Sequence, residues 1–335
     1  MRRTELKIVA LAASLLASAS VALAQTALAQ TALAQTYPAK PIRLIVPYPA
    51  GGGTDFFARL VGAKMSDQIG QPIVVENRPG AATIIGAEAA AKSPPDGYTA
   101  LLADVTTLAV NPSLYRKLPY DPQKDFAPIT LTARFAMLLV VNPALDRSKT
   151  VKEFVEEAKA VPGRINFASV GAGSPHHLAM ELFMQRTGIR LNHIPYKGAA
   201  PAVQDLVGGQ VPVMFLDLAA GGPQIRAGKV RALAVASPQR IAPLPDVPTI
   251  AESGVPGFEA WAWQGLVAPA GTPREALEKL RAEYTKAVAD AGVRQKLIEA
   301  GVEPLESSPE ELATYIRSET AKWAKVIQEG NIKVE

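Results

Sequence analysis

IRLIVPYPAGGGTDFFARL, residues 42–60, is a predicted strand and helix joined by a glycine-rich turn. INFASVGAGSPHHLAMEL, residues 165–182, repeats this arrangement later in the chain. Each turn would leave unpaired backbone N–H groups at a helix N-terminus, where they can face an anion. Two such turns in separate halves of one chain favour a ligand held between two α/β lobes.

Short apolar runs alternate with amphipathic segments along the rest of the chain. Strands are predicted at residues 42–48, 73–76, 98–103, 137–141, 165–169, 190–195, 211–216, 230–236 and 263–268. Helices are predicted at residues 54–69, 83–92, 151–160, 175–187 and 199–207 and from residues 273, 291 and 309. A looser stretch leads to Arg134. This alternation predicts an α/β fold with mostly parallel sheets and right-handed crossovers.

The length of the chain predicts two lobes. A single hydrophobic core stops growing at about 250–300 residues, and this chain has 335. We expect a first lobe from residues 37–136 and 258–335 and a second from residues 137–257. The chain would then cross between the lobes twice, near residues 136 and 257.

Capping side chains mark several of the predicted helix starts. Thr54 is the predicted N-cap of the first helix, and Ser174 precedes Pro175 at the start of the helix after the second turn. Three further starts match the capping box, in which a Ser or Thr precedes a Glu by three residues. They are Thr150 with Glu153, Thr272 with Glu275, and Ser308 with Glu311.

The composition excludes several classes of protein. The formal net charge is only +4, and basic residues are interspersed with acidic ones without a basic stripe. A surface that neutralises nucleic-acid phosphates is therefore not predicted. The chain has no cysteine, which excludes disulfides, a thiolate nucleophile and a Cys-ligated metal.

The N-terminus predicts a secretory signal peptide. A basic start is followed by an apolar segment at residues 8–21 and by the small-x-small sequence ALA at residues 22–24. We expect cleavage after Ala24, although the repeated pentad QTALA offers further sites after Ala29 and Ala34. The sequence contains no later segment long and apolar enough to span a bilayer. We therefore expect a periplasmic protein.

The first turn does not fit a nucleotide-binding motif. Gly51 and Gly53 match the first two glycines of a dinucleotide-binding fingerprint, but Phe56 stands at the position of the third. No Gly-Lys-Ser/Thr follows, as a phosphate-binding loop would require. We expect no cofactor.

The histidines do not form a recognisable metal or catalytic site. His176 and His177 are adjacent and should point away from each other on a helix, which makes a poor chelate. We expect one of them to be packed and one exposed, His193 to be structural, and no metal. A secreted hydrolase that uses Ser174 and His177 is an alternative, although Ser174 lies outside a Gly-x-Ser-x-Gly elbow.

Several motifs resemble, in their order, the Bug family, the extracytoplasmic substrate-binding proteins of tripartite tricarboxylate transporters. They are YPAKPIRLIVPYPAGGGTD (37–55), ENRPGA (76–81), PDGYT (95–99), NPSLY (111–115), LPYDPQKDFAPI (118–129), SPHHLAMELF (174–183), PYKGAAPAVQDLVGGQV (195–211), RAGKVRALAV (226–235) and GLVAPAGTP (265–273). The resemblance implies a two-lobed, type II Venus-flytrap fold. It also implies a monomer without enzymatic activity that closes on a small mono- or dicarboxylate and works with transporter membrane subunits. A ligand sensor for a signalling protein would use the same cleft.

The resemblance also implies which residues hold the ligand. In the first lobe they are Tyr48, Ala50, Gly51, Gly52, Thr54, Asp55 and Thr106, and in the second Ser169, Gly171, Ala172, Gly173, Ser174 and Asp217. Asp104 stands where relatives commonly have a small hydroxyl residue or glycine. If Asp104 faces the cleft, its charge would oppose a second ligand carboxylate and favour an amine, amide or hydroxyl donor. The alternative is that Asp104 is solvated or caps a helix.

Overall fold

The computed structural model of the protein describes residues 37–333. The predicted signal peptide, residues 1–24, and the alternative cleavage sites at Ala29 and Ala34 lie outside these residues. The chain divides into two units, Met1–Ala39 and Lys40–Glu335. All of the contacts discussed below lie within the second unit. Among the described residues, no helix combines the length and the apolar character needed to cross a membrane.

The strands form one ten-stranded sheet in the order β2-β1-β3-β9-β4-β7-β5-β6, with β8 and β10 also paired to β4. Their bounds are β1 Ile42–Val46, β2 Ile73–Asn77, β3 Thr99–Asp104, β4 Phe126–Val141, β5 Asn166–Ser169, β6 Asn192–Pro195, β7 Val213–Asp217, β8 Arg231–Val235, β9 Trp261–Pro269 and β10 Val302–Pro304. The central strands are apolar runs buried on both faces, as for β3 and β7, because helices cover the sheet.

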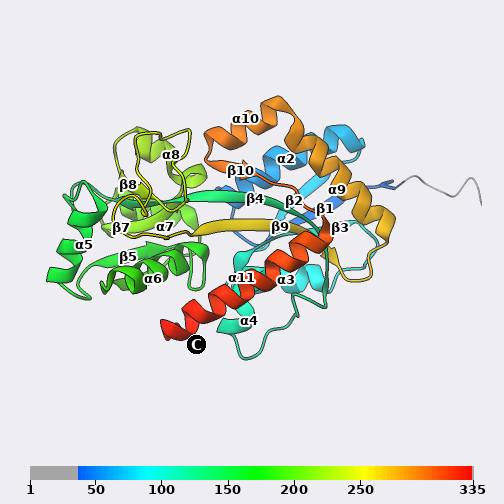
Figure 1. Cartoon of the computed structure of the whole chain (residues 1–335). Coiled ribbons are helices and arrows are strands. Elements are labelled where there is room, and N and C mark those ends of the chain that lie inside the picture. Colours follow the sequence, from blue (N-terminus) through cyan, green and yellow to red (C-terminus); the bar gives the residue numbers. More distant parts are fainter. Residues whose placement is uncertain (1–36, 334–335) are drawn as a thin grey trace, which may run out of the picture. The chain divides into compact units, whose positions relative to one another are not determined.

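Eight helices of the described residues follow predicted segments, whereas α8, α4 and the π-helix η1 have no predicted counterpart. Their bounds are α2 Gly53–Ile69, α3 Ile84–Ala91, α4 Asn111–Leu114, α5 Val151–Ala160, α6 Pro175–Thr187, α7 Ala199–Val207, α8 Leu218–Arg226, α9 Arg274–Ala289, α10 Ala291–Glu299 and α11 Pro309–Glu329, with a π-helix η1 at Thr106–Val110. In Figure 1, α5 to α8 gather at one end of β4 and α2, α9 and α10 at the other.

The long strand β4 changes its partners in the middle. From Phe126 to Ala136 it pairs with β9, and its last residues of that stretch also pair with β10. From Met137 onward it pairs with β7 and β8 instead. β4 and β9 therefore run side by side through the centre of this unit (Figure 1), and the change of partners falls at the predicted crossover near residue 136.

The sheet is mixed, so the prediction of mostly parallel sheets is wrong. β1 pairs in parallel with β2 and β3, and β5 with β6 and β7. All pairings of β4, and that of β3 with β9, are antiparallel. The physical reason is that β4 and β9 carry the chain between the two halves and run against the strands on either side of them.

Two predicted helix starts are also wrong. The N-cap of α2 is Gly52, so Thr54 lies inside the first turn. At α9 the N-cap is Pro273 without a side-chain cap, and the Thr272 hydroxyl donates to the Pro269 carbonyl. The capping box at Ser308 is confirmed, as is the Thr150 cap of α5.

The looser stretch before Arg134 contains η1, α4 and the first part of β4, which the pattern did not predict. Polar residues such as Thr130 and Thr132 interrupt its apolar run, yet both are fully buried. The Thr132 hydroxyl donates to the Gln264 carbonyl and that of Thr130 to the Ser307 carbonyl. Because each hydroxyl has a hydrogen-bond partner, these polar side chains can lie in a buried strand.

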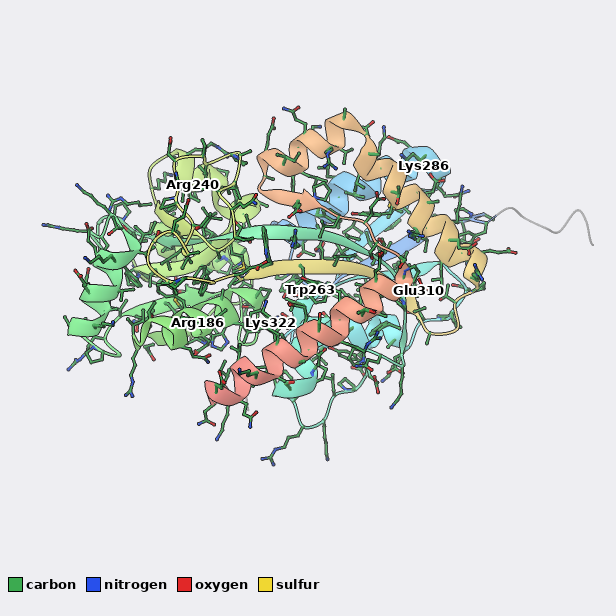
Figure 2. The ribbon with its side chains drawn as sticks, viewed as in Figure 1. Arg186, Arg240, Trp263, Lys286, Glu310 and Lys322 are labelled. Atoms are coloured by element: carbon green, nitrogen blue, oxygen red, sulfur yellow. The ribbon has the colours of Figure 1, made fainter. Side chains whose placement is uncertain are left out.

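The C-terminal helix α11 packs against β4 and η1. Trp263 of β9 faces this helix (Figure 2), and its indole N–H donates to Glu319 at 2.8 Å. Trp323 of α11 donates to the same carboxylate oxygen at 3.0 Å. A single buried carboxylate thus satisfies two large buried indoles and joins α11 to the sheet.

Candidate functional site

Two adjoining pockets lie where the two glycine-rich turns meet. The inner pocket encloses about 520 Å³, part of it open to solvent, and its walls include Tyr48, Gly53, Asp104, His176 and Asp217. The outer pocket is wider, at about 1350 Å³ measured in the same way, and its walls include residues 79–82, 170–172 and 195–198. Tyr48, Pro49 and Val170 line both pockets. Together they form one cleft.

The first turn presents the start of α2 to the inner pocket. Gly52, the N-cap, is extended (φ −91°, ψ 175°) and provides no side-chain cap. Gly52, Gly53 and Thr54 all line the pocket. The first N–H groups of α2 thus lack the usual capping oxygen and open into a cavity, a favourable arrangement for an anion.

Asp55 holds this turn in place from behind. Its carboxylate accepts the Gly51 N–H at 3.0 Å and is bonded by Arg59 and the Asn77 amide. Burial alone would raise the pKa of Asp55, but the hydrogen bonds from Arg59, Gly51 and Asn77 outweigh it and lower the pKa. Gly51 has φ +89°, a left-handed conformation that favours glycine. The Gly51 amide therefore faces Asp55.

The second turn is closed on itself. The Gly171 N–H donates to the Ser169 hydroxyl at 3.2 Å, the Gly173 N–H to His177 Nδ1 at 3.1 Å, and the Ser174 N–H to the Gly171 carbonyl at 3.1 Å. Ser174 caps α6 as predicted, by accepting the His177 backbone N–H. The expectation of unpaired amides therefore fails at these three amides of the second turn and at Gly51 of the first, whereas the start of α2 has no side-chain cap.

Three stacked rings support the second turn. The rings of His177 and His193 are parallel within 8° with centroids 3.8 Å apart, and Phe167 stacks on His193 at 4.8 Å. His193 Nε2 lies 2.6 Å from the Ser169 hydroxyl. Burial, with a smaller effect from His177, lowers the pKa of His193 to about 3. His193 therefore has the structural role that the sequence predicts.

His176 and His177 point to different sides of α6, yet both are buried, so the prediction that one is exposed is wrong. His177 faces the sheet, with its Nε2 3.3 Å from Glu181, and His176 faces the inner pocket. Ser174 bonds the backbone of His177 and not its ring. This geometry does not provide the nucleophile and base that a hydrolase requires.

Asp104 both lines the inner pocket and caps a helical turn. Tyr48 donates its hydroxyl to Asp104 Oδ2 at 2.6 Å, and Asp104 Oδ1 accepts from the Thr107 N–H and hydroxyl. Burial, followed by the charge of Asp104, raises the pKa of Tyr48 well above its usual value, so this hydroxyl keeps its proton. Asp104 is only 4% exposed, which rules out the solvated alternative.

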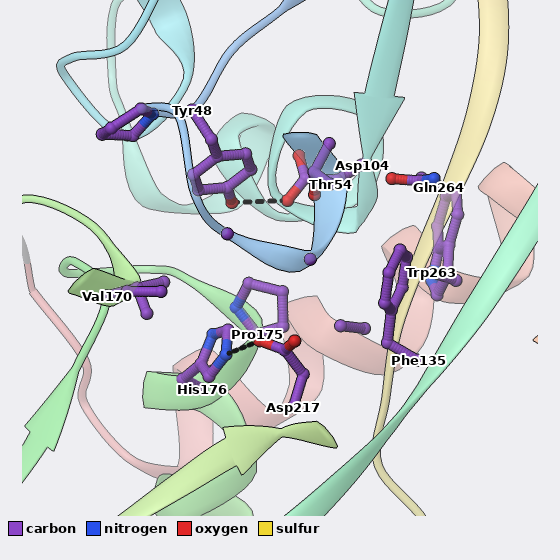
Figure 3. A pocket seen from close by; sticks show the side chains of 15 residues that line it. Tyr48, Thr54, Asp104, Phe135, Val170, Pro175, His176, Asp217, Trp263 and Gln264 are labelled. Carbon is purple, nitrogen blue, oxygen red and sulfur yellow. Dashed lines mark hydrogen bonds and ion pairs between the residues drawn. The ribbon is translucent and has the colours of Figure 1, made fainter. Parts of the chain in front are cut away.

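Asp217 lies on the opposite wall. Its Oδ1 caps α8 by accepting the Ala220 N–H at 2.9 Å, and its Oδ2 is 3.2 Å from His176 Nε2. Figure 3 shows this pair on one side of the start of α2 and the Tyr48–Asp104 pair on the other. The inner pocket therefore has a buried carboxylate on each side.

The sequence reasoning missed Gln264, which enters the inner pocket from β9. Gln264 is 1% exposed, and neither atom of its side-chain amide has a hydrogen-bond partner. Phe135 and Trp263 line the pocket beside it (Figure 3). The sequence signal that could have identified Gln264 is its position as the one side-chain amide in the apolar run of residues 261–269.

Each of the two turns contacts the opposite wall of the cleft. The Thr106 hydroxyl donates to the Gly173 carbonyl at 3.3 Å. A Cβ placed on Gly198 would lie 2.9 Å from Pro49, and one placed on Gly53 would lie 2.7 Å from Asp217. The two walls of the cleft therefore lie within van der Waals range of each other at these positions.

The predicted site residues fall into three groups. Those that line the inner pocket are Tyr48, Gly52, Thr54, Asp104 and Asp217. Those that line the outer pocket are Tyr48, Thr106, Gly171, Ala172 and Ser174. Those that line neither are Ala50, Gly51, Asp55, Ser169 and Gly173. Contact of any of these residues with a ligand stays a prediction.

Comparisons with known proteins agree with this architecture. The family model described as the tripartite tricarboxylate transporter family receptor matches residues 57–332. Protein BugT of Bordetella pertussis is 40% identical over 300 residues, which cover 89% of this chain and 92% of BugT. The structure of R. palustris Rpa4515 with adipate has a TM-score of 0.86 at 37% identity and covers 89% of this chain and 99% of its own. That of MatC from Rhodopseudomonas palustris with bound malate has a TM-score of 0.81 at 34% identity, with coverages of 87% and 100%.

Proposed function

Because the chain belongs to the tripartite tricarboxylate transporter receptor family, we propose that it captures a small organic acid in its cleft and delivers it to the membrane subunits of such a transporter. Members of this family are periplasmic solute-binding proteins and not enzymes. Two structural neighbours carry adipate and malate. The observation that supports a carboxylate ligand most strongly is the uncapped start of α2, which opens into the inner pocket.

The ligand carboxylate lies, in this proposal, at the N-terminus of α2. The N–H groups of Gly53 and Thr54 donate to it, and the positive end of the helix dipole adds a charge equivalent to about +0.5. From the outer pocket, Thr106 and Ser174 offer hydroxyl groups and Ala172 a backbone amide. Gly51, Asp55 and Ser169 shape the two turns from behind.

In this proposal the two lobes close over the ligand, so the protein has an open and a closed state. We assign residues 37–136 and 258–335 to one lobe and residues 137–257 to the other, because β4 changes its partners after Ala136. Each lobe contributes part of the cleft wall, so a ligand held by both walls stabilises the closed form. A sensor for a signalling protein would use the same closure, and a pull-down with solubilised membranes separates the two partners.

Secretion completes the proposal. Residues 1–24 direct the chain to the periplasm and are removed, with Ala29 and Ala34 as alternative cleavage points. The mature protein acts as a monomer. N-terminal sequencing of the secreted protein and its mass in solution test these two statements.

A thermal-shift panel tests the carboxylate ligand. Protein that has been unfolded and refolded to remove bound ligand is heated with succinate, glutarate, adipate, malate and their monoamides. An acid at about 100 times its Kd stabilises the folded protein by about 2.7 kcal/mol, which raises the melting temperature by several degrees. A panel without any shift would contradict the proposal.

Two variants sharpen this test. Gly52→Val should abolish the shift because the valine methyls would enter the space between the start of α2 and Ala199, whose Cβ is 3.8 Å from a Cβ built on Gly52. The backbone of Gly52 is extended, so valine fits it without strain. Gly292→Ala, at the start of α10 and outside both pockets, is the matched control and should keep the full shift.

A further inference from the structure

Gln264, like His176 Nδ1, is a buried side-chain group of the inner pocket without a hydrogen-bond partner. It is 1% exposed, and both its Oε1 and its Nε2 are buried without a partner. Folded proteins rarely leave a buried amide unsatisfied, and each exception requires an explanation. A bound ligand that donates to Oε1 and accepts from Nε2 would supply one.

The sheet places Gln264 beside Asp104. The two residues are direct cross-strand neighbours in the antiparallel pairing of β3 with β9, so their side chains lie on the same face of the sheet. Both line the inner pocket. Asp104 has three donors already, from Tyr48 and Thr107, whereas the Gln264 amide is free.

The charges of this pocket oppose a second carboxylate on the ligand. Asp104 and Asp217 both line it, and within residues 37–333 no lysine or arginine does. His176 is the basic group on its wall, and its Nε2 is engaged with Asp217. A second ligand carboxylate, without the N–H groups at the start of α2 that hold the first, would face like charges in a poorly solvated space, and no cation would offset them.

A primary amide satisfies the same groups. Its N–H donates to Gln264 Oε1, its carbonyl accepts from Gln264 Nε2, and its second N–H faces Asp104. An ammonium group could bond Oε1 but would leave Nε2 without an acceptor. The rings of Phe135 and Trp263 beside these groups suit the methylene segment between the two ends of such a ligand.

We propose that the inner pocket selects acids whose far end is a carboxamide over acids of the same length with a second carboxylate, and that Gln264 is the residue that recognises this end. This inference rests on the proposed function, in which the other end of the ligand is a carboxylate at the start of α2. It makes the protein a receptor for monoamides of dicarboxylic acids.

Calorimetric titration of the refolded mature protein with matched pairs tests the inference. The pairs are succinate with succinamate, glutarate with glutaramate, and adipate with adipamate, with γ-aminobutyrate as the ammonium counterpart of succinamate. The monoamide should bind about tenfold or more tightly in the pair of best length, because a site built for a hydrogen-bonding group rejects an analogue that lacks it. Diacids or γ-aminobutyrate that bind as tightly as the monoamides would overturn the inference.

The variant Gln264→Met separates recognition from a structural role. It should weaken monoamide binding about tenfold and reduce the preference over the diacid. The melting temperature of the ligand-free variant should be unchanged or higher, since the buried amide has no partner to lose. A lower melting temperature together with equal losses for both ligand classes would assign Gln264 a structural role and overturn the inference.

Two further variants complete the test. Gln295→Met replaces an exposed glutamine of α10 and should change neither affinity. Asp104→Asn removes one of the two carboxylate charges and should reduce the difference in affinity between the monoamide and the diacid. An unchanged difference in affinity would contradict the charge argument. A panel in which no acid and no monoamide binds would refute the proposed function itself, whereas diacids that bind equally well would refute only the preference.

Discussion

Gly53→Ala is predicted to weaken ligand binding without unfolding the protein. Gly53 is the first residue of α2, and a Cβ at this position would lie 2.7 Å from Asp217 Oδ1 and 3.2 Å from two ring atoms of Phe135. A separation below 3.0 Å is one that real Cβ atoms essentially never show. Asp217 cannot turn away freely, because the Ala220 N–H and His176 hold its carboxylate.

The larger part of the cost falls on the closed form. Asp217 belongs to the wall opposite α2, so the 2.7 Å contact disappears when the two walls separate. Overpacking of this kind costs about 1–3 kcal/mol, which corresponds to an affinity about 5- to 140-fold lower. The tight contact with Phe135 persists in the open form, but alanine also exceeds glycine in helix propensity by up to about 1 kcal/mol. We therefore expect a small change in the melting temperature of the ligand-free variant.

Calorimetric titration with the panel acid that gives the largest thermal shift measures this effect, with Gly292→Ala as the control. An affinity of Gly53→Ala within twofold of that of the natural protein would refute the reasoning. A large drop in the melting temperature of the ligand-free variant would refute it as well, because the clash would then exist in both forms.

Two further predictions concern stability. Between pH values of about 6.5 and 3, His193 binds a proton in the unfolded state but not in the folded state, so the free energy of unfolding decreases as the pH falls. From pH 7 to about 4.5 the loss would be about 2.7 kcal/mol for a fully buried group. Because His193 is partly exposed, we expect a loss of about 1–2 kcal/mol. Urea unfolding at the two pH values should show a smaller loss for His193→Gln, and an equal loss would argue against this account. Glu319→Ala should destabilise the protein by about 2–5 kcal/mol, because it leaves the indole N–H groups of Trp263 and Trp323 buried without an acceptor. The exposed Glu329→Ala should cost less than about 0.5 kcal/mol; similar denaturation midpoints for the two variants would contradict the assigned role of Glu319.

The sequence predicted well the features that depend on local signals. The apolar run after Pro41 ends at a glycine-rich turn, and α2 then begins within one residue of the predicted start. Ser308 and Glu311 form the predicted capping box, since both partners lie in one turn. Tyr48 and Thr54 line the inner pocket as expected, because the strand and the helix that carry them are adjacent in the chain.

Features that depend on long-range pairing were not predictable in this way. The orientation of β4 and β9 follows from the path of the chain between the two halves and not from their own composition. The amides of the second turn are bonded by Ser169, by His177 and by a carbonyl within the turn, and a glycine pattern does not show this. In the sequence, Gln264 is a single polar residue in an apolar strand. Its position in the cleft follows from the pairing of β9 with β3, which brings it beside Asp104.

The central claim is that a ligand carboxylate binds at the start of α2 inside the cleft. A crystal structure of the protein with the panel acid of highest affinity tests it most directly. We predict carboxylate oxygens within about 2.7–3.2 Å of the Gly53 and Thr54 amide nitrogens. A ligand bound elsewhere, or a cleft that stays empty at a saturating concentration of that acid, would contradict the claim.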